Sequence, residues 1–266
     1  MGKFLRLFIA MMMFAPSTGW ADDAVSWWRP NTEMKNWDIL LQEPPPIDAL
    51  PQRDVLILDV FDTPVETVTA LQKQGTWVVC YINVGAWENW RPDAKDFPSK
   101  LIGKRYRGWQ GEKWLDIRNR GLRPLIEARL DLCRDKGFDG VDPDNINGFE
   151  NTTGFSISET NQITFNRWLA RAAHSRGLGI GLKNATSLSQ NLVADFDWVL
   201  MEQCVAEGWC DEAAPFQKAG KAVYDIEYPE NNIDLAVNMA CKRVPDGVNV
   251  VFKDRQLTSA LHKCPQ

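Results

Sequence analysis

The feature of this sequence that most constrains its fold is the alternation of short apolar runs with segments of helical periodicity. Eight runs rich in valine, isoleucine and leucine recur along the chain. Such alternation is typical of repeated βα units, which build a parallel sheet. The predicted strands are 38–42, 55–60, 77–83, 138–144, 178–183, 198–202, 222–228 and 248–253. The predicted helices include 65–74, 121–136, 158–176, 232–243 and 256–262.

Eight strands with intervening helices predict an α/β fold, a single (β/α)8 TIM barrel. The residues from 22 to 266 are enough for one such barrel or for two smaller domains, and no linker divides them. A doubly wound open sheet is the alternative architecture. No glycine-rich phosphate loop follows the first strands, as that alternative would require for a nucleotide.

The first 21 residues have the pattern of a secretory signal peptide. Lys3 and Arg6 form a basic start, residues 7–15 are apolar, and small residues lead to a predicted cleavage site after Ala21. A permanent anchor is the alternative, although the apolar stretch is too short to span a bilayer. We therefore expect a secreted or periplasmic protein, a signal peptide over 1–21, a barrel domain over 22–266, and no later membrane span.

The acidic balance of the chain restricts its partners. The formal net charge is −5, and the isoelectric point is near 5.2. Nucleic acids and anionic membranes require a basic surface, so we expect neither as a partner. A cationic or neutral ligand suits this charge better, and we expect a monomer that needs no cofactor.

Six cysteines in an exported protein make disulfides plausible. The first predicted pair is Cys204 with Cys210, and the second is Cys241 with Cys264. Two further cysteines, at positions 80 and 133, fit either buried thiols or a third bridge. The Cys-x5-Cys spacing of Cys204 and Cys210, with only two histidines in the chain, matches no usual zinc site, so we predict no metal.

Twelve tryptophans are an unusually large number for a chain of this length. Several of them lie outside the apolar strand runs, including Trp27, Trp28, Trp87, Trp90, Trp109 and Trp114. Indole faces stack on sugar rings, although core packing is the better explanation for any single tryptophan. As a group, they favour a carbohydrate ligand.

Polar residues follow the apolar part of nearly every predicted strand. Because barrel active sites form at the carboxyl ends of the strands, these side chains should converge on one cavity. Asp142 and Asp144 end the fourth strand and should share one face, if the segment is extended rather than an acidic turn. The other strand-end residues are Asp59, Asn83, Lys183, Glu202, Glu227 and Lys253.

Several segments resemble glycoside hydrolase family 114, the endo-α-1,4-polygalactosaminidases. They include 81–85, 115–118, 137–140, 142–145, 183–184, 201–204 and 252–254. The resemblance implies a barrel that cleaves α-1,4-linked galactosamine polymers internally, with Asp144 and Glu202 as the working pair. The family commonly has glutamate where this chain has Asp142, which favours Asp144 as the catalyst.

Glycosidic cleavage needs one carboxylic acid to protonate the leaving oxygen and one carboxylate to act as nucleophile or base. We predict Asp144 as nucleophile or base and Glu202 as acid, with Asp142 as a charge-tuning or sugar-contacting neighbour. A cationic amino-sugar oligosaccharide or polysaccharide is the expected substrate. The predicted substrate contacts are Asp59, Tyr81, Asn83, Asn145, Lys183, Asn184, Glu227, Tyr228 and Lys253.

Two other functions fit the same residues. One is a catalytically silent barrel that captures polysaccharide through its tryptophans. The other is a calcium- or magnesium-dependent hydrolase that uses Asp59, Asp142, Asp144 and Glu202 as oxygen ligands.

Overall fold

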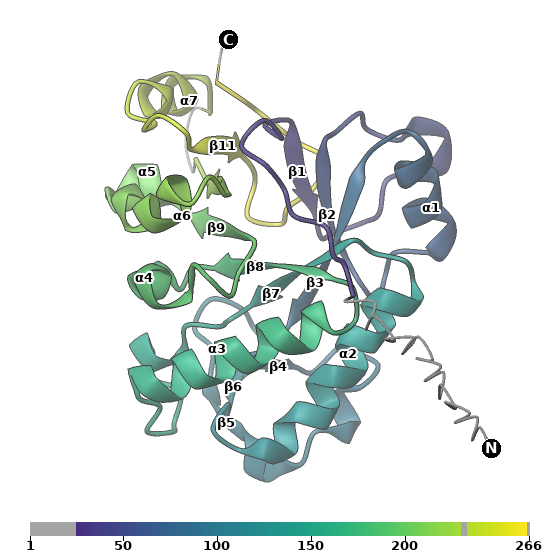
Figure 1. Ribbon diagram of the computed structural model, residues 1–266, viewed down its shortest axis with the longest axis vertical. Helices are drawn as coiled ribbons and strands as arrows, with labels where there is room; N and C mark the ends of the chain where they lie inside the picture. Colours follow the sequence, from purple (N-terminus) through teal and green to yellow (C-terminus); the bar gives the residue numbers. More distant parts are fainter. Residues whose placement is uncertain (1–24, 230–232, 265–266) are drawn as a thin grey trace, which may run out of the picture.

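Eight parallel strands form a nearly closed barrel in the computed structural model, which describes residues 25–229 and 233–264 (Figure 1). Neighbouring strands pair in chain order, and all eight predicted strands are confirmed. In barrel order they are β1 (Trp37–Leu40), β2 (Val55–Asp59), β3 (Trp77–Asn83), β7 (Gly140–Asp144), β8 (Gly179–Lys183), β9 (Trp198–Glu202), β10 (Ala222–Glu227) and β11 (Asn249–Phe252). The predicted TIM barrel is therefore confirmed.

Helices surround the barrel (Figure 1). The α-helices are α1 (Val65–Lys73), α2 (Arg123–Asp135), α3 (Glu159–His174), α4 (Ser189–Leu192), α5 (Cys204–Glu207), α6 (Ala214–Lys218) and α7 (Ile233–Cys241). Short 3-10 helices are η1 (Ile47–Ala49), η2 (Ala94–Asp96), η3 (Ser99–Leu101), η4 (Arg120–Leu122), η5 (Gly148–Glu150), η6 (Thr186–Leu188) and η7 (Cys210–Ala213). Four of the five predicted helices are confirmed as α1, α2, α3 and α7.

The predicted helix over 256–262 is wrong. The Asp254 carboxylate accepts hydrogen bonds from the Gln256 amide at 2.8 Å and from the Thr258 hydroxyl, which favours a turn over a helix. Leu257 has a φ of 53°, which no right-handed helix allows. The chain then runs back along β11, where Phe252 and His262 form an antiparallel bridge.

A second, antiparallel sheet is inserted between β3 and α2. It contains β4 (Ala86–Glu88), β5 (Ile102–Arg105) and β6 (Glu112–Leu115), in the order β4-β6-β5. The sequence analysis did not predict these strands, because they are three or four residues long and carry charged residues instead of an apolar run. This insertion forms part of the site described below.

The barrel interior and the helix-facing layer follow the strand alternation. In β8, Gly179, Gly181 and Lys183 share the inner face, as the sequence predicts. A Cβ atom on Gly181 would lie 2.2 Å from the Trp198 indole nitrogen, so the ring fills the space that a side chain at 181 would need. Trp28 stacks on Trp77 and also packs against Trp198, which gives this predicted loop tryptophan a packing role.

Three disulfides are present. Cys204–Cys210 and Cys241–Cys264 confirm the two predicted pairs. Cys80 on β3 and Cys133 on α2 form the third bridge, with their Cα atoms 5.9 Å apart. The outer face of β3 packs against the inner face of α2, which brings these two buried sulfurs together. The alternative of buried free thiols is therefore excluded in this structure.

In the part of the chain that the structure describes, no helix is both long enough and apolar enough to cross a membrane. The predicted signal peptide over 1–21 lies outside the described residues.

Candidate active site

A cavity of about 800 Å³ opens at the carboxyl ends of the barrel strands. Its floor comes from the last residues of four strands, and its rim comes from the loops that follow them and from the inserted sheet. The strand-end residues in its lining are Asp59, Asp144, Lys183 and Glu202, and Tyr81 lies two residues before the end of β3. The loops contribute Asn145, Asn184, Gln203 and Tyr228, and the insertion contributes Glu88, Trp90, Arg91, Tyr106, Trp109, Glu112 and Trp114.

Asp144 is the acid at the end of β7, and its carboxylate is held by two donors. The Tyr81 hydroxyl donates to Oδ2 at 3.0 Å, and the Asn145 amide nitrogen donates to the same oxygen at 3.2 Å. Burial raises the pKa of Asp144, and the Glu202 charge raises it further, against the opposing charge of Lys183. Asp144 therefore binds a proton more tightly than an ordinary aspartate does.

Glu202 ends β9 and has the opposite environment. Asn184 and Tyr228 donate hydrogen bonds to its two carboxylate oxygens. Burial opposes ionisation here too, but the Lys183 charge and these two hydrogen bonds lower the pKa of Glu202 below its ordinary value. The two carboxyl groups thus have pKa values moved in opposite directions, as expected of an acid and base pair.

Asp142 lies below the cavity floor and does not line it. Its Oδ2 atom pairs with the Lys183 ammonium at 3.3 Å, and both side chains are buried. Burial raises the pKa of Asp142 to about 6, despite the Lys183 charge. Asp142 shares a face with Asp144 but lies two residues earlier on β7, where it pairs with Lys183. Its role as a catalytic candidate stays a prediction.

The chain turns sharply after each of three neighbouring strands. Asn145, Asn184 and Gln203 follow Asp144, Lys183 and Glu202, and their φ angles are 61°, 50° and 64°. The left-handed conformation is tolerated by asparagine but unfavourable for glutamine. It allows two consecutive side chains at each strand end to line the cavity, which ordinary strand alternation would forbid. Unusual backbone conformations of this kind cluster at functional sites.

Most of the predicted substrate contacts line the cavity. They are Asp59, Tyr81, Asn145, Lys183, Asn184 and Tyr228.

The other three do not line it, and each has structural partners. Asn83 accepts the Ala86 amide at 2.8 Å and is buried. Glu227 lies on the outer face of β10, where it accepts the Val205 and Ala206 amides at 2.8 and 3.1 Å. Lys253 is buried and pairs with Asp38 at 2.8 Å.

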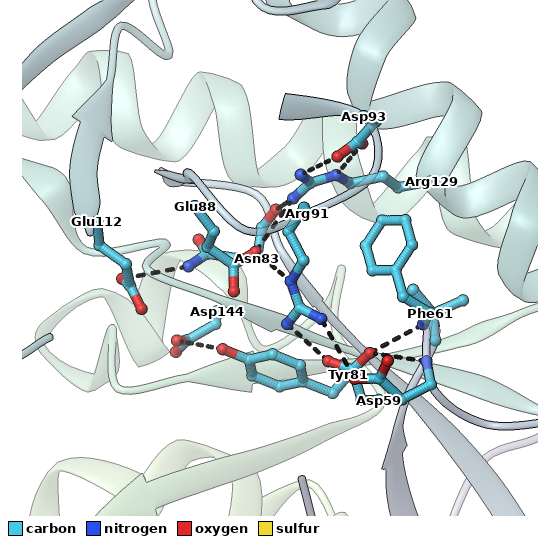
Figure 2. Close-up of polar contacts among 12 residues, drawn as sticks. Asp59, Phe61, Tyr81, Asn83, Glu88, Arg91, Asp93, Glu112, Arg129 and Asp144 are labelled. Atoms are coloured by element: carbon cyan, nitrogen blue, oxygen red, sulfur yellow. Dashed lines mark hydrogen bonds and ion pairs between the residues drawn. The ribbon is translucent and has the colours of Figure 1, made fainter. Parts of the chain in front are cut away.

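The sequence analysis missed a charged network on the insertion (Figure 2). Arg91 pairs with Asp59 at 2.6 Å and with Glu88 at 2.9 Å, so the insertion is fastened to the end of β2. Arg129 from α2 approaches Glu88 at 3.7 Å and Asp93 at 2.7 Å. The signal that could have revealed this network is the density of acids and arginines among Trp87, Trp90, Trp109 and Trp114.

The described residues contain no group of three or more His, Cys, Asp or Glu side chains arranged to hold a metal ion. The carboxylates considered above as calcium or magnesium ligands have other partners. Asp59 is paired with Arg91, and Asp142 is paired with Lys183. The hypothesis of a metal-dependent hydrolase thus has no ligand set in this part of the chain.

A TIM barrel with two half-buried carboxyl groups facing a polar cavity at its strand ends is the architecture of a glycoside hydrolase. The sequence model of glycoside-hydrolase family GH114 matches residues 18–266, and the chain belongs to that family. The resemblance noted in the sequence is therefore confirmed.

Two solved structures extend the comparison. Aspergillus fumigatus Ega3, determined in complex with galactosamine, is 34% identical to this chain with a TM-score of 0.84, over 92% of this chain and 100% of Ega3. The glycoside hydrolase domain of Pseudomonas aeruginosa PelA is 15% identical with a TM-score of 0.69, over 87% of this chain and 99% of that domain, and shares the fold. No curated protein sequence gives a significant match.

Proposed function

We propose that this protein cleaves internal α-1,4 linkages of a galactosamine-containing polysaccharide, with Asp144 and Glu202 as the catalytic carboxyl pair. The observation that carries the proposal is the placement of these two half-buried acids, with oppositely shifted pKa values, in one cavity. The similarity to Ega3, whose structure contains galactosamine, supports an amino sugar as the substrate.

In this reaction Glu202 protonates the departing glycosidic oxygen, and Asp144 acts as nucleophile or activates water. These roles require that Glu202 carry the proton when substrate is bound. Without substrate, the raised pKa of Asp144 and the lowered pKa of Glu202 favour the proton on Asp144. A cationic sugar beside Asp144 stabilises the ionised form of that carboxyl. Because the charge of an ionised Asp144 opposes ionisation of Glu202, the proposed roles require that substrate binding shift the proton from Asp144 to Glu202.

The charge of the cavity supports a cationic substrate. Six acids and three basic residues line it, so carboxylates outnumber cations two to one. The acids are Asp59, Asp62, Glu88, Glu112, Asp144 and Glu202, and the basic residues are Arg91, Lys183 and Arg255. An ammonium group on the sugar reduces the repulsion among these acids, which a neutral sugar does not.

The three disulfides support export to an oxidising compartment, consistent with the predicted signal peptide. The exposed indoles of Trp90 and Trp109 in the cavity lining support a chain-like ligand, because they offer stacking faces beyond the carboxyl pair.

The test is cleavage of defined α-1,4-galactosamine oligosaccharides, followed by mass spectrometry. The wild-type protein is expected to release shorter internal fragments. Asp144→Asn and Glu202→Gln should each lower kcat by at least ~10³-fold, because each removes one half of the acid and base pair. Asp48→Asn, which changes an exposed carboxylate of η1 away from the cavity, is the control and should retain full activity.

Full activity in either site variant would refute the pair. Binding of oligosaccharide by the wild-type protein without any shorter products would favour the silent binding barrel instead. The roles are separated by an aryl galactosaminide whose leaving group needs no protonation. Glu202→Gln should cleave this substrate far faster than Asp144→Asn does, and the reverse order would exchange the two roles.

A further inference from the structure

Glu112 is a buried carboxylate of the insertion whose side chain reaches the cavity. It begins β6, and strand alternation turns Glu112 and Trp114 to the cavity side while Lys113 faces away. Only 5% of the surface of Glu112 is exposed to solvent. In Figure 2 its carboxylate lies on the same side of the network as Asp144 and Tyr81, with Arg129 and Asp93 at the far end.

The neighbouring acids already have cations or several donors. Arg91 pairs with both Asp59 and Glu88, and Arg129 adds a second cation beside Glu88. Asp144 and Glu202 each accept two side-chain hydrogen bonds. These carboxylates therefore have partners before any ligand arrives.

Glu112 differs from all of them. Among the described residues its carboxylate accepts one hydrogen bond, a long one of 3.4 Å from the Asn83 amide, and it forms no ion pair within 4.0 Å. Asn83 cannot turn to improve this bond, because its oxygen is held by the Ala86 and Asn145 nitrogens. A buried carboxylate that faces a cavity with so little compensation is a site for a cation.

The electrostatics agree with this geometry. Burial raises the pKa of Glu112 to about 8, and the charges of Asp144 and Glu88 add to the effect. The Asn83 hydrogen bond and the Arg91 charge act in the opposite direction and do not offset it. A cation entering the space beside Asp144 would reverse this balance and favour the ionised form of Glu112.

We propose that Glu112 receives the ammonium group of the amino sugar bound beside Asp144 and is the residue that selects a free amine over an N-acetylated or neutral sugar. This inference rests on the proposed function, because it names the residue through which the same site recognises its substrate. N-acetylation would remove the positive charge and leave Glu112 without a cation.

The test compares the binding of D-galactosamine, N-acetyl-D-galactosamine and D-galactose by calorimetric titration. Glu112→Gln is the informative variant, because a glutamine oxygen can still accept the Asn83 hydrogen bond while the charge is lost. The wild-type protein should prefer galactosamine, and the variant should bind it about 10- to 100-fold more weakly, as expected for one charge-assisted contact. Its affinity for the other two sugars should change less than about threefold on the same grounds.

Asp62→Asn is the matched control. It removes the same charge from a cavity residue whose side chain is 61% exposed and lies 3.9 Å from Arg91. If the net negative field alone were responsible, both variants would lose the amine preference to a similar extent. The proposal predicts that the Asp62 variant loses at most about threefold of the preference, as expected of a solvent-screened charge, whereas the Glu112 variant loses about 10- to 100-fold.

A wild-type protein without amine preference would overturn the assignment of Glu112, as would a Glu112→Gln variant that keeps the preference. An equal loss of affinity for all three sugars would indicate a structural role only. Failure of the proposed function is recognised separately, as amine-selective binding with no cleavage of oligosaccharides.

Discussion

Individual side chains show how local environment, more than residue type, decides the state of an acid in this barrel. Asp225 and Glu227 lie on the outer face of β10 and are both buried. Glu227 accepts two backbone amides at the start of α5, which stabilise its negative charge. Burial raises the pKa of Asp225 to about 9, and the adjacent Glu227 charge contributes. Asp225 is therefore protonated at neutral pH.

This assignment predicts a pH-dependent stability. Folding raises the pKa of Asp225, so the protonated side chain contributes to the stability of the fold. This contribution is complete below the unfolded pKa of about 4 and is lost as the pH rises toward 9. Asparagine imitates the protonated acid, so Asp225→Asn should remove this loss. We expect the Tm of the variant relative to wild type to rise by about 5 °C between pH 7 and pH 9, within the ~1.4 kcal/mol available per pH unit. Thermal unfolding at pH 5, 7 and 9 measures it, and parallel Tm curves would rule the assignment out.

The strand-end acids illustrate what residue patterns can predict and where they fail. The placement of Asp144 and Glu202 followed from strand ends, because the carboxyl edge of a parallel barrel is one surface. The sequence analysis expected Glu227 to point into the cavity, but strand alternation turns it outward. Since Tyr224 and Ile226 occupy the barrel interior, Glu227 faces the helices. Glu112 could not be found, since its relation to Asp144 depends on how the insertion folds.

At the scale of elements, the loops after the strands are held by close backbone contacts. Gly85 follows β3 and approaches the turn after β7, where its amide and that of Val84 donate to the Asp144 carbonyl. A Cβ atom on Gly85 would lie 1.7 Å from the Asn145 carbonyl oxygen. No rotamer change relieves this clash, because the backbone fixes the positions of both atoms.

Gly85→Ala should therefore push the β7 turn away from β3 and displace Asp144. We expect a destabilisation of about 1–3 kcal/mol from this overpacking, together with a fall in kcat that exceeds any change in KM. Gly148→Ala is the control, because a Cβ there would meet its nearest atoms at an ordinary 3.5 Å. Urea unfolding and oligosaccharide cleavage measure the two effects. Equal behaviour of the two variants would contradict the role of this contact.

Strands and helices with a regular hydrophobic pattern were predicted from the sequence, and those without one were missed. All eight barrel strands and four helices carry patterns that local chemistry enforces, such as Ser158, which caps α3 in a reciprocal arrangement with Asn161. The inserted strands β4, β5 and β6 carry none, because they are stabilised by tertiary ion pairs such as Arg91 with Glu88. A tight turn at Asp254 overrode the helical periodicity of 256–262.

At the scale of the whole molecule, the barrel is closed by side chains between its first and last strands. Among the described residues, no backbone ladder joins β1 to β11. Instead, the Trp37 indole donates to the Asn249 carbonyl at 3.0 Å, and Lys253 just after β11 pairs with Asp38 on β1 at 2.8 Å. Lys253 also donates to the Thr258 carbonyl at 2.7 Å, so the same ammonium anchors the C-terminal segment.

This closure predicts that Lys253 supports stability and not catalysis. Lys253→Met should leave the buried Asp38 with Arg53, at 3.4 Å, as its remaining ion-pair partner among the described residues, and destabilise the protein by about 3–5 kcal/mol. Adding Asp38→Asn to that variant should recover part of the loss, because the uncompensated charge is then gone, and the coupling energy should be about 1–3 kcal/mol. Denaturant unfolding of the wild type, both single variants and the double variant measures it.

Since Lys253 does not line the cavity, each folded variant should keep its kcat on galactosamine oligosaccharides within about twofold, as expected of a residue distant from the chemistry. Strictly additive effects would show that the pair does not close the barrel, and a selective loss of kcat would return Lys253 to the substrate-binding residues.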